Sequence, residues 1–110
     1  MELSLERIIE ALTRLGLSAF DAEVYVYIAN KGRQKAVNLA KTLDNNKSTI
    51  YASLRNLRKK GLVIKTGIYF SAIPFEEGLD SLIKMEKERA KALHKSKKEL
   101  LAIWKKEKTI

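Results

Sequence analysis

The sequence of 110 residues has no cysteine, one proline and one histidine, and these absences exclude several classes of protein. Without cysteine the chain has no disulfide, no thiol nucleophile and no cysteine-based zinc site. The lone histidine, His94, has no metal-binding companion at helical spacing, so we predict neither a metal site nor a cofactor. The sequence also has no glycine-rich phosphate loop and no cysteine–histidine pair. We therefore predict that the protein is not an enzyme.

Long apolar runs are missing as well. The longest run covers residues 24–29, whereas a membrane-spanning helix needs about 20 apolar residues. The first ten residues mix charged with apolar side chains and do not resemble a signal peptide. Because a chain without cysteine suits a reducing compartment, we expect a cytoplasmic protein with no membrane partner.

Acidic residues are scarce in the middle of the chain. Between Lys31 and Phe75 there are ten basic residues and one acidic residue, Asp44, so this segment carries the whole formal net charge of +9. The remainder of the chain contains twelve residues of each sign. A basic surface that served only solubility would spread its excess along the chain. A confined excess is typical of a face that binds a polyanion.

Apolar spacing predicts two helices in the first third of the chain. Ser4 precedes an apolar stripe that ends at Gly16. Ser18 is a candidate cap for the second helix, with Asp21 in the capping-box position three residues later. We expect this helix to stop at Lys31, because a cation and then a glycine favour a helix C-terminus.

The next segment predicts a helix-turn-helix. Residues 36–43 form a short amphipathic stretch, and residues 44–46 favour a turn. A second helix follows over residues 47–60, capped by Ser48 or by Asn46. Two short helices across a tight polar turn are typical of this DNA-binding motif.

A β-hairpin is predicted directly after these helices. Residues 62–64 and 68–70 are short runs rich in β-branched and aromatic side chains, with a turn at 65–67. A hairpin in this place is the wing of a winged helix. We therefore predict a mainly α fold class with a small β-hairpin, in which residues 1–74 form a winged helix-turn-helix domain.

The remaining residues, 75–110, predict one long helix that serves dimerisation. Alternating steps of four and three define an apolar seam with two polar interruptions, Glu86 and Lys97. Such a stripe must be buried against something, and a second copy is the simplest partner, in a parallel or an antiparallel coiled coil. The predicted dimerisation residues are Leu79, Ile83, Ala90, Leu93, Leu100 and Trp104.

Several short blocks of the sequence together resemble a known family. The blocks are Leu15-Gly16-Leu17-Ser18, Ala22-Glu23-Val24-Tyr25, Lys47-Ser48-Thr49-Ile50-Tyr51, Leu54-Arg55-Asn56-Leu57, Lys60-Gly61-Leu62-Val63, and Ala72-Ile73-Pro74 with Glu76-Glu77 and Leu79. Their order and spacing over residues 12–83 are similar to the N-terminal domain of TrmB-type archaeal transcriptional regulators. The resemblance implies an archaeal transcription factor that binds double-stranded DNA.

Two departures limit what the resemblance implies. Members of that family usually carry a large C-terminal domain that binds sugars, whereas this chain ends after one helix, so we infer no small-molecule effector. Family wings usually hold basic residues near the turn, but residues 67–71 contain none. The sequence therefore predicts only a weak wing contact with the minor groove.

A helical wheel over residues 47–60 assigns roles to the predicted recognition helix. When Ile50, Leu54 and Leu57 point inward, the opposite face points toward the major groove. Short side chains and donors on that face are candidates for base contacts, namely Ser48, Thr49, Ala52, Arg55 and Asn56. The candidates for phosphate contacts are Lys41, Lys47, Tyr51, Arg58, Lys59 and Lys65.

Three functions remain open at this point. The first is a dimeric transcriptional regulator that represses by occluding a promoter. The second is an architectural protein that coats DNA with little sequence preference. The third is a winged-helix adaptor that binds other proteins, and the absence of acidic residues between Lys47 and Lys65 disfavours it.

Overall fold

The computed structural model describes residues 2–108, and capping residues mark where its second helix begins and ends. The Ser18 side chain accepts a 3.0 Å hydrogen bond from the Asp21 amide at the start of the second helix. Gly32, with φ +89°, closes that helix by donating its amide to the Ile28 carbonyl. The predicted ends of this helix are thus confirmed.

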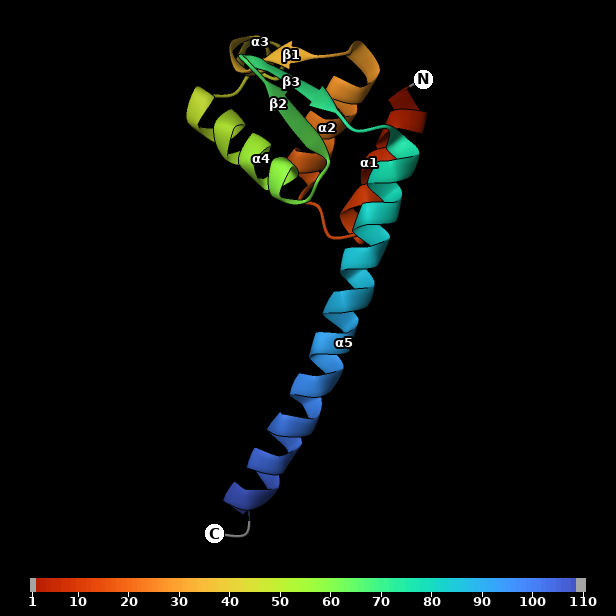
Figure 1. The fold of residues 1–110 in the computed structure, drawn as a ribbon, viewed down its shortest axis with the longest axis vertical. Coiled ribbons are helices and arrows are strands. Elements are labelled where there is room, and N and C mark those ends of the chain that lie inside the picture. Colours follow the sequence, from red (N-terminus) through yellow and green to blue (C-terminus); the bar gives the residue numbers. More distant parts are fainter. Residues whose placement is uncertain (1, 109–110) are drawn as a thin grey trace.

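The elements follow the predicted order, with one additional strand (Figure 1). They are α1 (Glu2–Arg14), α2 (Ala19–Lys31), β1 (Gln34–Lys35), α3 (Ala36–Thr42), α4 (Lys47–Lys59), β2 (Val63–Thr66), β3 (Tyr69–Ala72) and α5 (Phe75–Lys108). Both helices of the helix-turn-helix end one residue before their predicted limits.

The wing is a three-stranded antiparallel sheet in the order β1-β3-β2, rather than the two-stranded hairpin that was predicted. The prediction also put the turn at residues 65–67. In the structure Thr66 pairs with Tyr69 across a two-residue loop. Gly67, the first residue of that loop, has φ +63°, which a tight hairpin requires. The sequence analysis did not predict β1, because a strand of two residues is too short to show a hydrophobic periodicity.

The core lies between α2, the helix-turn-helix and the inner face of the sheet. Its largest fully buried side chain is Tyr25, on α2. The Tyr25 hydroxyl donates a 2.7 Å hydrogen bond to the carbonyl of Ile73, just before α5. A Cβ atom on Gly78 would lie 2.9 Å from that hydroxyl. Glycine at this position therefore allows α5 to cross closely over α2.

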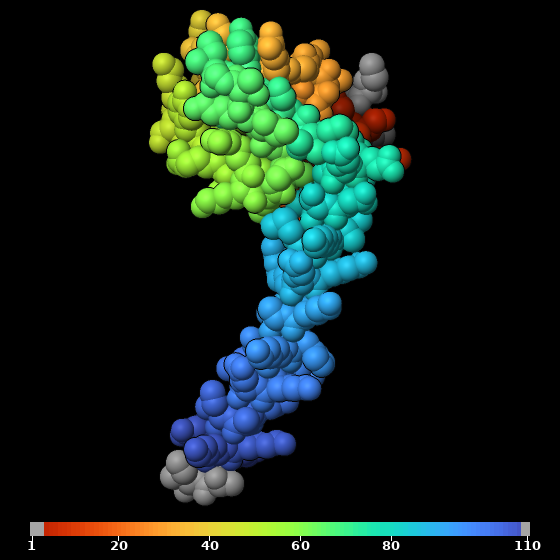
Figure 2. Space-filling view, viewed as in Figure 1, coloured from red at the N-terminus to blue at the C-terminus, as the bar shows by residue number. Residues whose placement is uncertain are grey.

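α5 packs on the domain with its first turns and then leaves it (Figures 1 and 2). Leu82 is 1% exposed within the core, and Leu79 packs against the core from its edge. Beyond these turns the helix projects as a rod, and the structure measures 59 × 28 × 25 Å. Packing of the domain thus extends past residue 74. Over residues 2–108, no helix has both the length and the apolar character of a membrane span.

Candidate nucleic-acid interface

The turn between α3 and α4 presents the N-terminus of α4 to solvent. Asp44 adopts φ +48°, a left-handed conformation that this type of residue tolerates. The Asn46 side chain then accepts a 2.8 Å hydrogen bond from the Thr49 amide and caps α4. Of the two predicted caps, Asn46 is therefore the one used. Ser48 remains exposed and available to a partner.

α4 buries the three predicted apolar residues, Ile50, Leu54 and Leu57. Among the candidate base contacts, Ser48, Arg55 and Asn56 are exposed, whereas Thr49 and Ala52 are half-buried. Tyr51 is 44% exposed, so its side chain is partly packed against the protein and partly exposed to solvent. The other phosphate-contact candidates are all exposed, namely Lys41, Lys47, Arg58, Lys59 and Lys65.

A buried polar contact, which the sequence analysis missed, sets the orientation of α4. The Ser53 hydroxyl donates a 2.6 Å hydrogen bond to the Asp21 carboxylate, and both residues are buried. Asp21 was predicted as a capping-box partner, but only its amide takes part in the cap. Its carboxylate turns toward α4 instead. The signal in the sequence was a serine at the inner spacing between Ile50 and Leu57.

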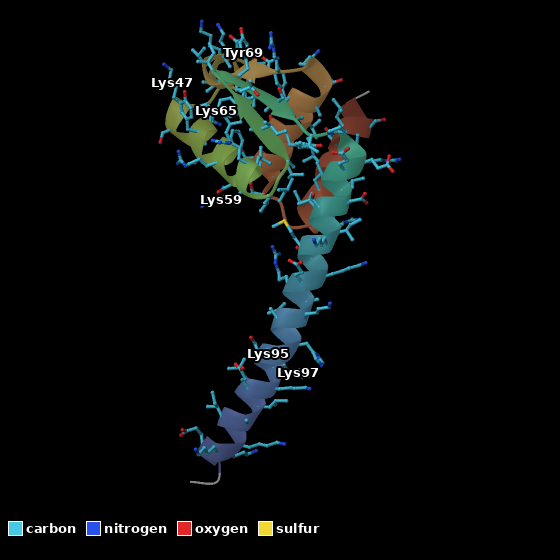
Figure 3. All side chains as sticks on the ribbon, in the orientation of Figure 1. Lys47, Lys59, Lys65, Tyr69, Lys95 and Lys97 are labelled. Atoms are coloured by element: carbon cyan, nitrogen blue, oxygen red, sulfur yellow. The ribbon has the colours of Figure 1, made fainter. Side chains whose placement is uncertain are left out.

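The C-terminal half of α4 and strand β2 enclose an open groove of about 530 Å³. Four of the six residues that line it are basic, namely Arg55, Arg58, Lys59 and Lys65, and none is acidic. Figure 3 shows Lys59 at one end of α4, Lys47 at the other end and Lys65 on β2. The fold therefore brings together candidates from the recognition helix and the wing. A groove of this charge attracts an anionic strand.

The outer edge of the sheet carries cations that the sequence analysis did not assign to the wing. Lys35 on β1 pairs directly with Tyr69 on β3. The Arg33 guanidinium lies 4.3 Å from the centre of the Tyr69 ring, and the Lys35 ammonium lies 5.6 Å from it. Such cation–π contacts restrain a long basic side chain. Strand β1 and the preceding Arg33 thus supply basic groups that residues 67–71 lack.

The predicted dimerisation residues divide into two groups along α5. Leu79 packs against its own domain. Glu86, a polar residue of the seam, lies against Gly16 and forms a 2.9 Å ion pair with Arg89. The others are exposed in the chain described here, namely Ile83, Ala90, Leu93, Leu100 and Trp104. Leu93, Leu100 and Trp104 are each more than 60% exposed. Apart from Ile83, the part of the seam that is free for a partner therefore lies beyond the domain.

Comparisons with known proteins agree with this architecture. A family model described as "Sugar-specific transcriptional regulator TrmB" matches residues 12–76. The uncharacterized protein MJ1503 of Methanocaldococcus jannaschii is 35% identical, over 56% of this chain and 54% of that protein. The solved structure of TrmBL2, an archaeal chromatin protein described as having a novel mode of DNA binding, is similar with a TM-score of 0.72 and 27% identity.

That similarity to TrmBL2 covers 91% of this chain but 42% of the TrmBL2 chain. The chain thus spans about half the length of these two relatives. The family model, in contrast, matches more than half of this chain and covers the helix-turn-helix and the sheet. The chain belongs to the TrmB family.

Proposed function

We propose that the protein is a DNA-binding transcriptional regulator that inserts α4 into the major groove. The observation that carries this proposal is the cationic groove between α4 and β2, with no acidic residue in its lining. Family membership and the DNA binding named for TrmBL2 support it. Because the groove adjoins the exposed face of α4, one duplex can contact both surfaces.

The roles of individual residues follow from their positions. The half of α4 near Asn46 enters the major groove of the DNA. There Ser48, Thr49 and Ala52 are short enough to permit close approach to the bases. Arg55 lies on the exposed face at the start of the cationic groove and binds guanine or a neighbouring phosphate. Asn56 flanks it. A phosphate strand then runs between α4 and β2, along Arg58, Lys59 and Lys65, and Lys41, Lys47 and Tyr51 contact the backbone farther along.

The sheet edge adds a wing contact. Arg33 and Lys35 lie against the Tyr69 ring, on the face of the sheet opposite Lys65, which pairs with Phe70. We expect them to bind phosphates at the flank of the minor groove. This contact comes from β1 and the preceding Arg33, so it does not need basic residues at the tip of the hairpin.

The regulator acts as a homodimer through the exposed part of the α5 seam. Residues Leu93, Leu100 and Trp104 are apolar, exposed and spaced for one helix face. A second copy that covers them would place two recognition helices about a two-fold axis. Half-sites are then expected about 10 bp, one DNA turn, apart. A bound dimer would repress by occluding a promoter.

An architectural role is the second candidate, and the chromatin role named for TrmBL2 favours it. Selection of bound duplexes from a random pool tests both. A regulator enriches a symmetric motif and prefers it about a thousandfold or more over random duplex. An architectural protein enriches none. With about six phosphate contacts, either role predicts a log–log salt slope of roughly −5, and a slope near zero would refute DNA binding.

A further inference from the structure

Five lysines form a continuous row on the part of α5 that leads away from the domain. We call Lys84, Lys87, Lys91, Lys95 and Lys98 the lysine ladder, and all five are exposed. Successive members are three or four residues apart, so each is the surface neighbour of the next. At 100° per residue, the ladder lies on the side of α5 opposite Leu93, Leu100 and Trp104. Figure 3 labels Lys95, a ladder member, and Lys97, which is nearer the apolar side.

The ladder has an arrangement that an isolated helix disfavours. Like charges at spacings of three or four residues destabilise a helix, and a face that is merely solvated usually alternates Glu with Lys at these spacings. Glu88 neighbours Lys84 and Lys91 at these spacings, but residues 89–98 contain five basic residues and no acidic one. The Glu86–Arg89 ion pair lies outside the ladder, and no ladder lysine is within 4.0 Å of a carboxylate in the described chain. An external anion would relieve the repulsion among Lys91, Lys95 and Lys98.

We propose that the lysine ladder binds the phosphate backbone of nucleic acid and forms a second contact surface outside the winged helix. This inference rests on the proposed DNA-binding function. The ladder extends over roughly 21 Å, with about one charge per 5 Å of helix, because each residue rises about 1.5 Å. One DNA strand carries a phosphate about every 3.4 Å. A strand that follows the helix would therefore meet about two lysines for every three phosphates.

The position of the ladder also leaves it accessible in the proposed dimer. A second copy that covers Leu93, Leu100 and Trp104 occupies the opposite side of the helix. No aromatic side chain interrupts the ladder face, so it lacks the apolar anchors by which protein partners are usually held. A phosphate does not need such an anchor, because lysine binds it as a point charge.

The experiment compares three double variants of the full chain on a duplex of about 60 bp, titrated from about 50 to 200 mM salt. K91Q/K95Q removes two ladder charges, whereas R7Q/R14Q removes two charges from α1. K91R/K95R keeps the ladder charges. If each lysine displaces counterions, K91Q/K95Q should lower the magnitude of the log–log slope by about 1.8 per chain. The other two variants should keep the slope of the parent. Sedimentation of each variant reports whether its assembly state has changed.

The outcomes separate this inference from the proposed function. If the parent binds the duplex and an Arg55→Ala variant weakens binding, but K91Q/K95Q and R7Q/R14Q have equal slopes, the ladder is not a phosphate site. An equal loss in both variants would indicate a general effect of net charge and would also overturn the inference. Binding to vesicles of anionic lipid that depends on Lys91 and Lys95, with an unchanged DNA slope, would assign the ladder to membranes instead. If the parent does not bind DNA at all, the proposed function fails first.

Discussion

Ser53 on α4 and Asp21 on α2 meet in the core, where the serine hydroxyl donates a 2.6 Å hydrogen bond to the carboxylate. This contact joins the recognition helix to the central helix of the domain. Apolar packing by Ile50, Leu54 and Leu57 resists separation of α4 from the core but adapts to small rotations. A directional bond between buried polar groups limits that rotation. The contact therefore positions the exposed face of α4.

Ser53→Ala is expected to lower the free energy of unfolding by about 1.5–3 kcal/mol, because the buried Asp21 carboxylate loses a charge-assisted hydrogen bond. Urea denaturation of the variant measures this loss. Ser48→Ala on the same helix is the matched control, since Ser48 is exposed and the cap is provided by Asn46. Equal stability of the two variants would show that the contact does not stabilise the domain.

Arg55→Ala should weaken binding to the selected DNA site by about 1–3 kcal/mol, because a groove contact is lost. Its melting temperature should stay close to that of the parent, since Arg55 is exposed and outside the core. Fluorescence anisotropy against the selected site and a scrambled site measures the effect. Arg14→Ala, on the exposed side of α1, is the control for charge. Unchanged binding by Arg55→Ala would remove this residue from the interface.

Deletion of the chain after Arg89 should produce a folded monomer with much weaker DNA binding. This cut keeps Leu79 and Leu82, which belong to the core, and removes the exposed seam from Ala90 onward. A cut after Pro74 would remove core residues and confuse unfolding with dissociation. Sedimentation equilibrium measures the assembly state, and Leu100→Glu in the full chain gives an independent test. A stable dimer after both changes would locate the interface elsewhere, for example on α1.

Gly78→Ala should destabilise the protein by about 1–3 kcal/mol through overpacking. Its new Cβ would lie 2.9 Å from the Tyr25 hydroxyl and 3.1 Å from a Leu62 methyl group. In a Tyr25→Phe background the first of these clashes disappears, so the same substitution should cost less there. Denaturant unfolding of the parent, the two single variants and the double variant measures the coupling free energy between the two positions. Additive effects would mean that α5 shifts freely over α2.

Stability should decline in alkali above about pH 10. Burial raises the pKa of Tyr25 above its ordinary value of 10.0. Below that value both the folded and unfolded states hold the phenol proton, so the contribution to stability is fully present. As the pH rises further, the unfolded state releases the proton more readily and stability falls. Tyr25→Phe should flatten this part of the stability profile, and an identical decline in both proteins would assign it to other groups.

Local sequence patterns predict the order and type of nearly all elements of this fold. Glycine and capping residues mark the helix ends at Ser18 and Gly32, and apolar periodicity correctly identifies Ile50, Leu54 and Leu57 as core. These features are local, because they depend on backbone preferences and on side chains three or four residues apart. The family resemblance and the basic character of residues 31–75 were equally readable from the chain.

Other features depend on contacts between residues far apart in the sequence, and no local pattern predicts them. Strand β1 exists because Gln34 and Lys35 find partners on β3, 35 residues or so away by sequence, a separation at which local pattern carries no information. The same pairing brings Arg33 to Tyr69, and folding brings Lys65 beside Arg55. Leu82 lay outside the predicted seam, yet it is buried, because α5 crosses the domain before it projects. Periodicity identifies an apolar face of a helix, but only the arrangement in space decides which surface covers it.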